Sequence, residues 1–274
     1  MSTENKYSAV VEEMRKGNKF LVISHLNPEG DAIGSLMGLA LALRADGKEV
    51  VAYLEDDLPD MFDFLPGSET IVHDLTGLGP FDATFAVDCG QMERLGPKFV
   101  EFEGKGTLVN VDHHATNDSF GAVNVIDPDA SAAGEMVFDL INAAEIKIDK
   151  AIATNLYVAI HTDTGSFRYS CSTPGAFKKA GALVELGADP WDVSTHVYEN
   201  LPYKRFLLLG LVLSTMEVME YDGVKVASLV VTNDMFVRSG AGRELSDGFV
   251  NYARSVEGVE VGMLVKESEN PGTI

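Results

Sequence analysis

The sequence predicts an α/β fold: a parallel sheet with helices on both faces, followed by a second, smaller α/β domain that is incomplete. Several segments are apolar over nearly their whole length, which is typical of parallel strands buried on both faces. Helical segments separate these runs, and that alternation is the pattern of α/β proteins. A chain of 274 residues is also long for one hydrophobic core, so we expect two lobes.

The first half of the chain supplies the strands of the main sheet. We expect helices over 8–16 and 32–45, and strands over 20–24, 49–54, 83–88 and 107–112. Further helices are expected over 131–143, 150–162, 174–187 and 203–218. The last segment predicts strands over 225–231 and 259–265 around a helix near 244–255. Two strands and one helix are too few for an independent domain, so we expect the chain to end within its second domain.

Composition and charge exclude several classes of protein. Lys and Arg number 21 against 42 Asp and Glu, and the net charge of −21 argues against a protein that coats long DNA or RNA. Only two cysteines occur, Cys89 and Cys171, which excludes a disulfide scaffold and a cysteine-built zinc site. The polar N-terminus lacks the apolar stretch of a signal peptide, and the longest apolar runs are too short to span a bilayer. We therefore expect a cytoplasmic protein with no membrane partner.

Acidic and histidine side chains follow three of the expected strands. They are His25, Glu29 and Asp31 after the first strand, Asp88 at the third, and Asp112, His113 and His114 at the fourth. The segment 157–170, which is helical in part, contributes Asp163. Because ligands of open parallel sheets bind at the carboxyl ends of strands, we expect these side chains at one edge. Taken alone, the first segment is equally well a polar loop in which Asp31 caps the following helix, but three such strand ends favour a site.

The converging acids predict metal ions. Five carboxylates without compensation would repel one another and shift one another's pKa, and divalent cations resolve that repulsion. Oxygen and imidazole ligands without a thiolate suit manganese or magnesium better than a structural zinc. The carboxylates are enough for two metals, about 3.5–4 Å apart, that share a bridging acid. Such a pair can generate hydroxide from water and stabilise both oxygens of an in-line displacement at phosphorus.

These residues, in this order, resemble the four motifs of the DHH phosphoesterase superfamily. The naming motif stands here as Asp112-His113-His114, and the first motif as HLNPEGDAIGS over 25–35. The second motif is Asp88 in VDCG, and the fourth is Asp163 in HTDTG. The similarity spans most of the chain, and the segments HLNPEGDAIGS and YVAIHTDTGSFRYS look most like the NrnA-type branch.

The resemblance implies domains and metal ligands. It implies a DHH catalytic domain over 1–200, a linker helix over 201–221 and a partial DHHA1-like substrate-binding domain over 222–274. It implies one manganese ion held by His25, Glu29 and Asp88. It implies a second held by Asp31, Asp88, His113 and Asp163, so that Asp88 bridges. Magnesium is an alternative metal for both positions.

The resemblance also implies catalytic roles, for Asp88, Asp112 and His114. Asp112 is expected to orient a ligand histidine. His114 is expected to face the scissile phosphate, as a transition-state stabiliser or a proton donor. We add Arg168 as a candidate phosphate contact, the alternative being an ordinary surface arginine.

The NrnA-type branch implies a manganese-dependent phosphoesterase. Its substrates are short oligonucleotides (nanoRNA), cleaved to 5′-mononucleotides, and 3′-phosphoadenosine 5′-phosphate (pAp), cleaved to AMP. A homodimer is implied as well, and long nucleic acids are not expected as partners. Two alternatives stay open: a manganese inorganic pyrophosphatase, which shares the four motifs, and a non-catalytic module that binds metal or nucleotide.

Two departures from the family pattern stand out. Glu29 occupies a position where the family has aspartate, which keeps the charge and adds a methylene. The glycine-rich Gly-Gly-Gly-His motif of the family's second domain, which grips the substrate nucleotide, does not occur in this sequence. We therefore expect a chain that is truncated in that domain.

Overall fold

The computed structural model describes residues 3–268, which form two compact units that divide after Val197. The helices of the first unit are α1 (Thr3–Lys16), α2 (Gly30–Ala45), α3 (Pro97–Glu101), α4 (Ala133–Ala143), α5 (Lys150–Asp163), α6 (Pro174–Glu185) and α7 (Pro190–Ser194). Its short 3₁₀ turns are η1 (Asp60–Phe62), η2 (Ser68–Thr70) and η3 (Met92–Leu95). A π-helical turn, η4 (Thr195–Glu199), crosses the boundary between the units.

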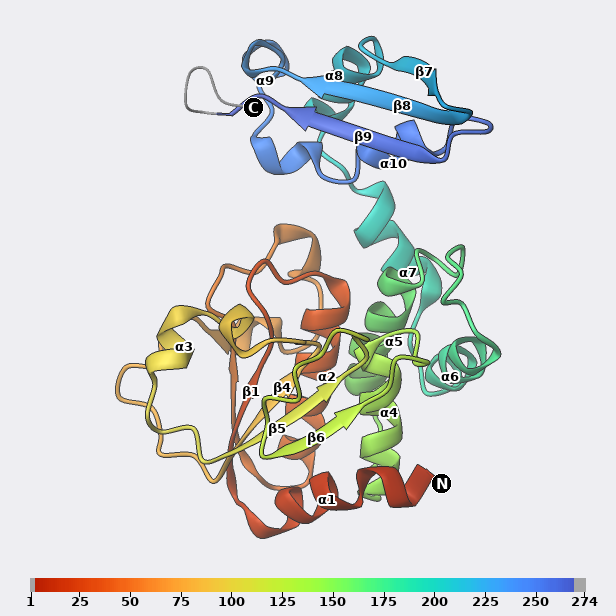
Figure 1. Ribbon diagram of the computed structural model, residues 1–274. Coiled ribbons are helices and arrows are strands. Elements are labelled where there is room, and N and C mark those ends of the chain that lie inside the picture. Colours follow the sequence, from red (N-terminus) through yellow and green to blue (C-terminus); the bar gives the residue numbers. More distant parts are fainter. Residues whose placement is uncertain (1–2, 269–274) are drawn as a thin grey trace. The chain divides into compact units, whose positions relative to one another are not determined.

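A six-stranded parallel sheet forms the centre of the first unit (Figure 1). Its strands are β1 (Lys19–Ile23), β2 (Glu49–Tyr53), β3 (Ile71–Val72), β4 (Ala83–Val87), β5 (Thr107–Asp112) and β6 (Val123–Ile126). Their order is β3-β2-β1-β4-β5-β6, and every pair is parallel. The predicted fold class is confirmed. The order places β1, β4 and β5 side by side, so their carboxyl ends share one edge.

Both faces of the sheet are buried, which explains the continuous apolar runs. In β1, Phe20 and Val22 join a large core cluster, which includes apolar residues of α1, α2, α4 and α5. The alternate residues Leu21 and Ile23 join a second cluster on the other face, together with residues of η3 and α3. Since successive side chains of a strand point to opposite faces, residues 20–23 of β1 all have to be apolar.

Side-chain caps and glycines fix where the helices of the first unit lie. α5 and α6 begin at N-caps, because the side chain of Asp149 accepts the N–H of Ile152 and that of Thr173 accepts the N–H of Ala176. α2 packs against α5, and Gly34 of α2 lies at the contact. This packing carries the start of α2 and the end of α5 to the same region of the sheet edge.

The second unit contains a three-stranded sheet of order β7-β8-β9. Its elements are α8 (Tyr203–Leu213), β7 (Glu217–Tyr221), β8 (Val224–Val231), α9 (Asn233–Ser239), η5 (Arg243–Ser246), α10 (Val250–Arg254) and β9 (Val261–Lys266). β7 pairs antiparallel with β8, and β9 pairs parallel with it. The unit has its own core, in which Leu208 of α8, Leu229 of β8 and Phe249 are fully buried.

The expected elements of the second unit are partly wrong. The helix expected over 203–218 ends at Leu213, and β7 follows after a turn in which Thr215 Oγ1 accepts the N–H of Val230 at 2.9 Å. The helix expected near 244–255 is divided into the turn η5 and the short helix α10. In the described part of the chain, no helix is both long and apolar enough to cross a membrane.

Candidate functional site

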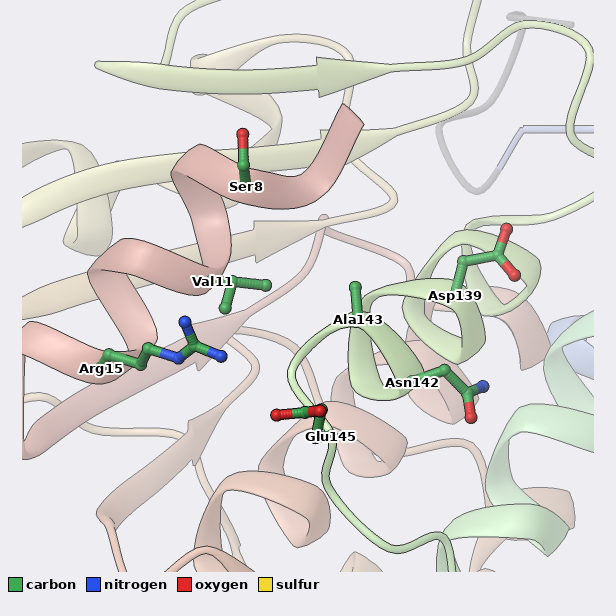
Figure 2. Close-up of a pocket in the computed structure, with 7 residues that line it drawn as sticks. All are labelled: Ser8, Val11, Arg15, Asp139, Asn142, Ala143 and Glu145. Carbon is green, nitrogen blue, oxygen red and sulfur yellow. The ribbon is translucent and has the colours of Figure 1, made fainter. Parts of the chain in front are cut away.

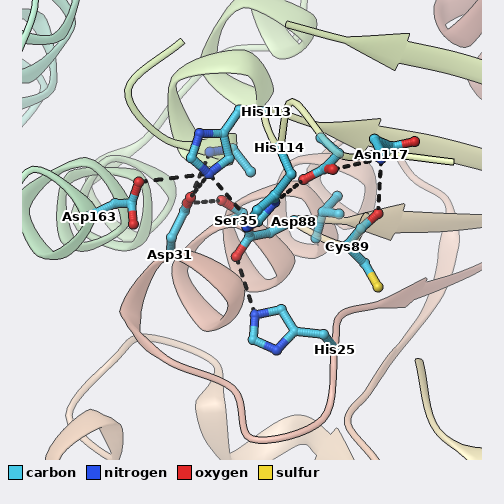
Figure 3. A network of polar contacts seen from close by, with 12 residues as sticks. His25, Asp31, Ser35, Asp88, Cys89, His113, His114, Asn117 and Asp163 are labelled. Carbon is cyan, nitrogen blue, oxygen red and sulfur yellow. Dashed lines mark hydrogen bonds and ion pairs between the residues drawn. The ribbon is translucent and has the colours of Figure 1, made fainter. Parts of the chain in front are cut away.

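The carboxyl edge of the main sheet gathers the side chains that the sequence predicts as metal ligands (Figure 3). The residues after β1, β4 and β5 meet there, and the first turn of α2 and the last residue of α5 reach the same place. The structure brings together all the expected ligands: His25, Glu29, Asp31, Asp88, His113 and Asp163. They fall into groups in which the ligand atoms lie within 4.8 Å of one another, a spacing that one bound cation can span.

The first group consists of His25, Glu29 and Asp88. The Nε2 of His25 lies 3.4 Å from Glu29 Oε1 and 3.5 Å from Asp88 Oδ2. His25 and Asp88 are buried, whereas Glu29 is exposed. The Nδ1 of His25 lies 2.7 Å from the carbonyl oxygen of Leu26 and 3.3 Å from the Nη2 of Arg94, and the shorter contact, to an oxygen that can only accept, places the proton on Nδ1. In the neutral imidazole this leaves the lone pair on Nε2, facing the two carboxylates, as a metal ligand requires.

The second group consists of Asp31, His113 and Asp163. The Nε2 of His113 lies 3.7 Å from Asp31 Oδ2 and 3.7 Å from Asp163 Oδ2. It also lies 3.5 Å from Asp88 Oδ1. The Nδ1 of His113 faces the carbonyl oxygen of Ala130 at 3.3 Å. Both candidate ligand histidines are thus anchored to the backbone through Nδ1 and present Nε2 to carboxylates.

Asp88 links the two groups. Its Oδ2 faces His25 and its Oδ1 faces His113, each at 3.5 Å. Oδ1 is buried, and no described residue donates a hydrogen bond to it. A buried carboxylate oxygen without a partner is costly. A cation bound to this oxygen would satisfy it, so the residues present fit a metal ion.

The electrostatics of the site also fit a cation. Burial raises the pKa of Asp163 to about 6, with help from the carboxylates of Asp88 and Glu29 and against His113. Burial and the charges of Asp88 and Asp163 raise the pKa of Asp31 well above its ordinary value. The site therefore holds more negative charge than its own imidazoles balance, and it takes up positive charge readily.

The pKa of His25 is raised as well, which for an imidazole favours the charged form. Burial lowers the pKa of His25, but Asp88, Glu29 and the Leu26 carbonyl outweigh burial and raise it to about 10. For Asp88, burial raises the pKa, but His113 and His25 outweigh burial and lower it to about 2. Asp88 is thus the carboxylate that stays ionised at the centre of the site.

The carboxylate of Asp31 is fixed by the start of α4. Its Oδ2 accepts the N–H of Ala133 at 2.6 Å, and its Oδ1 accepts the N–H of Gly134 at 2.9 Å. The hydroxyl of Ser35 donates to Oδ1 at 2.7 Å. The positive end of a helix stabilises a carboxylate, so Asp31 keeps its position although it is buried among other acids.

Asp112 holds His114. Its Oδ1 lies 2.7 Å from the Nδ1 of His114, and this hydrogen bond raises the pKa of His114. Asp112 is fully buried, whereas the side chain of His114 is 38% exposed. The histidine that Asp112 orients is therefore His114 and not His113, whose Nδ1 faces Ala130 instead. His114 Nδ1 also lies 3.8 Å from Asp88 Oδ1.

Arg168 lies in the turn after α5. Its Nε donates to the carbonyl oxygen of Gly165 at 2.7 Å, and the turn passes through left-handed backbone at Ser166 and Phe167, with φ of 58° and 60°. The polar contacts within the described residues do not join Arg168 to the candidate metal ligands. A phosphate contact at Arg168 stays a prediction.

Two asparagines behind the site were not predicted from the sequence. Asn110 is fully buried in β5, and Asn117 follows in the loop after His114. The Nδ2 of Asn117 donates to Asp112 Oδ2 at 2.6 Å. A polar residue inside the otherwise apolar run TLVNVD is a signal that could have indicated Asn110, whereas nothing distinguishes Asn117 among its polar neighbours.

A hollow of about 540 Å³ lies elsewhere on the first unit, between α1 and the end of α4 (Figure 2). Its polar lining includes Arg15, Asp139 and Glu145. None of the candidate metal ligands lines it, so the candidate site is defined by the side chains at the sheet edge and not by this hollow.

Comparison with known proteins identifies the family. Residues 19–160 match the DHH family, N-terminal domain. The chain is 36% identical over 248 residues to the bifunctional oligoribonuclease and PAP phosphatase NrnA of Thermus thermophilus, a match that covers 90% of this chain and 72% of that protein. It is 21% identical over 251 residues to the protein of the same name from Bacillus subtilis, covering 90% and 77%.

A solved structure agrees with the sequence matches. An exopolyphosphatase-related protein from Bacteroides fragilis superposes with a TM-score of 0.89 at 26% identity, covering 96% of this chain and 80% of that one. The resemblance that the motifs indicate is confirmed. The chain therefore belongs to the DHH family, as an NrnA-type phosphoesterase.

Proposed function

We propose that this chain hydrolyses short oligonucleotides to 5′-mononucleotides and pAp to AMP. Its relatives from Thermus thermophilus and Bacillus subtilis are named for oligoribonuclease and PAP phosphatase activity. The observation that carries the proposal is the meeting of two histidines and four carboxylates at one sheet edge, with Asp88 facing both His25 and His113. Phosphoester hydrolysis is the chemistry for which such a ligand set is suited.

We infer two divalent cations per chain, with manganese preferred and magnesium possible. The first would be held by His25, Glu29 and Asp88, and the second by Asp31, Asp88, His113 and Asp163. Carboxylate and imidazole donors without a thiolate support this choice of metal. When bound, such cations supply Lewis acidity at the phosphate and lower the pKa of water.

The protein's own acid–base group is His114. Asp112 holds its Nδ1 at 2.7 Å, so Nε2 is the ring atom that can carry a proton toward substrate. A protonated imidazole can stabilise the charge that develops on phosphate and donate its proton to the leaving oxygen. Asp112 keeps the ring oriented and is the positioning partner of this step.

The charge of the chain favours a short substrate. A net charge of −21 does not suit an extended groove for long single strands, which needs many basic side chains. One or two phosphates can be held by the metals alone. We propose that the unit after Val197 belongs to the substrate-binding domain and that the first unit is the catalytic domain.

Hydrolysis assays with three substrates test the proposal. A labelled RNA dinucleotide, pAp and pyrophosphate are each incubated with the protein and manganese. We expect cleavage of the dinucleotide and of pAp but not of pyrophosphate. Cleavage of pyrophosphate alone would reverse the choice of substrate, and no cleavage of any of them would favour a non-catalytic binding module.

A pair of matched variants connects turnover to the site. Asp88→Asn removes the shared charge but keeps a residue that tolerates left-handed backbone, since Asp88 has φ of 55°. Asp222→Asn is the control, because Asp222 also has positive φ, 51°, and is exposed in the turn between β7 and β8. We expect Asp88→Asn to abolish turnover and Asp222→Asn to leave it unchanged.

A further inference from the structure

Asn117 connects two parts of the candidate site. Its Nδ2 donates to Asp112 Oδ2 at 2.6 Å and to Asn110 Oδ1 at 2.8 Å, and it lies 3.2 Å from the carbonyl oxygen of Cys89 (Figure 3). Its Oδ1 accepts the N–H of Ser119 at 2.7 Å. Because a backbone N–H can only donate, this last bond fixes the orientation of the amide, with Nδ2 toward Asp112.

Through Asp112, Asn117 is linked to His114. The Oδ2 of Asp112 is occupied by Asn117, and its Oδ1 is occupied by the Nδ1 of His114. Asp112 is fully buried, so the direction of its carboxylate depends on the donors around it. A carboxylate held at both oxygens cannot rotate, and the imidazole that it holds keeps one orientation.

Through the carbonyl of Cys89, Asn117 is also linked to Asp88. This residue is in the left-handed region, with φ of 55°, which aspartate adopts more readily than most residues with a side chain but which still costs free energy unless neighbours hold it. The next carbonyl, that of Cys89, accepts from Asn117 at 3.2 Å and from Asn110 Nδ2 at 3.0 Å. The two asparagines therefore hold the turn that presents Asp88.

We propose that Asn117 is a positioning residue for phosphoester hydrolysis, which holds Asp112 against His114 and fixes the turn that presents Asp88. The inference rests on the proposed function for its kinetic consequence, but the geometry it describes exists without substrate or metal. Asn117 touches neither the candidate ligand atoms nor the Nε2 of His114, so it acts through Asp112 and the Cys89 carbonyl.

Substitution of Asn117 is expected to affect turnover more than substrate binding. In Asn117→Ala the Oδ2 of Asp112 loses its donor, and the carboxylate can turn away from His114. Loss of such an outer partner costs activity by about 10–100-fold in metal sites. We expect kcat to fall by this factor with KM nearly unchanged, since an interaction made in the transition state is lost. Asn117→Asp, which keeps the shape but replaces the donor, is expected to lose as much.

Asn124→Ala is the matched control. Asn124 lies in the neighbouring strand β6, is half-buried, and makes two hydrogen bonds to the backbone of Gly121, at 2.9 Å and 2.7 Å. These bonds resemble the loop bonds of Asn117 but reach neither Asp112 nor Cys89. We expect Asn124→Ala to keep the kcat of the wild type, even if its thermal stability falls.

A spectroscopic measurement separates positioning from loss of structure. In the metal-free protein with ¹⁵N-labelled histidine, we expect the neutral ring of His114 to carry its proton on Nδ1, toward Asp112. His114→Gln identifies its signals. In Asn117→Ala and in the smaller change Asn117→Ser, the population should move toward the Nε2–H tautomer, whereas Asn124→Ala should resemble the wild type.

The outcomes distinguish this inference from the proposed function. A fall in kcat together with the tautomer shift supports the role of Asn117. A kcat equal to that of Asn124→Ala, or a fall without a tautomer shift, overturns it. If the wild type hydrolyses no substrate while the tautomer still shifts, the proposed function fails and the positioning of His114 by Asn117 holds.

Discussion

A Cβ atom placed on Gly34 would lie 2.4 Å from the backbone carbonyl oxygen of Asn155. The backbones of α2 and α5 are therefore in contact at this point, and position 34 has no room for a side chain. The contact matters for the site, because α2 carries Asp31 in its first turn and α5 ends at Asp163. These two carboxylates face the same nitrogen of His113, at 3.7 Å each.

Gly34→Ala is expected to push the helices apart and to destabilise the first unit. Overpacking a core contact costs about 1–3 kcal/mol, measured here as the change in urea unfolding. Gly181→Ala in α6 is the control, since a Cβ at Gly181 meets nothing within 4 Å. Alanine is the better helix former by about 1 kcal/mol, so Gly181→Ala should stabilise. Equal effects of the two substitutions would contradict the close contact.

Metal binding is expected to raise the thermal stability of the protein. A ligand that binds only the folded state at 100 times its Kd stabilises by about 2.7 kcal/mol. We expect manganese, added after removal of metal with a chelator, to raise Tm in the wild type but not in the double variant His25→Gln/His113→Gln, which removes one ligand from each group. His73→Gln is the control, because His73 Nδ1 also faces a backbone carbonyl, that of Leu54 at 2.9 Å. A rise in Tm that survives the double variant would place the metal elsewhere.

The parts of the fold that can be predicted from sequence are those with two buried faces. β1, β4 and β5 are apolar at nearly every position, because each side chain enters a core. β3 has two residues and β6 four, too few for a pattern. The helix expected over 203–218 extends past Leu213 into a turn and the first two residues of β7, where Met216 and Val218 continue the apolar spacing of the helix.

Asp82 is expected to make the stability of the first unit depend on acid pH. Its Oδ2 accepts the N–H groups of Asn18 and Lys19, at 2.7 Å and 2.9 Å, and these bonds lower the pKa of Asp82. A carboxyl group whose pKa is lower in the folded state stabilises that state above its unfolded pKa. The contribution is lost as pH falls through the folded value.

Asp82→Asn, which resembles the protonated acid, should therefore be less stable than the wild type at pH 7. The difference should shrink as the pH is lowered from about 5 to 3, across the ordinary range of an aspartate. Urea unfolding at several pH values measures it. The exposed Asp57→Asn is the control and should match the wild type throughout. A difference that is constant with pH would show that the charge of Asp82 is not involved.

As with the fold, one part of the candidate site can be predicted from the sequence and another part cannot. The residues after β1, β4 and β5 can be placed together from sequence, because parallel neighbouring strands deliver their carboxyl ends to one edge. The partner of Asp112 cannot, since it depends on how the loop 113–119 folds. The hydrogen bonds of Asn117 depend on the same loop, and its local sequence ATNDSF carries no signal for them.

Asp112 and His114 are expected to act as one unit, which a double-mutant cycle can measure. If His114 transfers a proton, His114→Gln should lower kcat by about 10²-fold or more, and Asp112→Asn by about 10–100-fold through misorientation of the ring. Once His114 is absent, Asp112 has no ring to orient, so the double variant should have the kcat of His114→Gln. Asp192→Asn is the control, because Asp192 faces His196 in an exposed pair at 3.5 Å and should leave kcat unchanged. Effects that multiply in the double variant would mean that Asp112 contributes independently of His114.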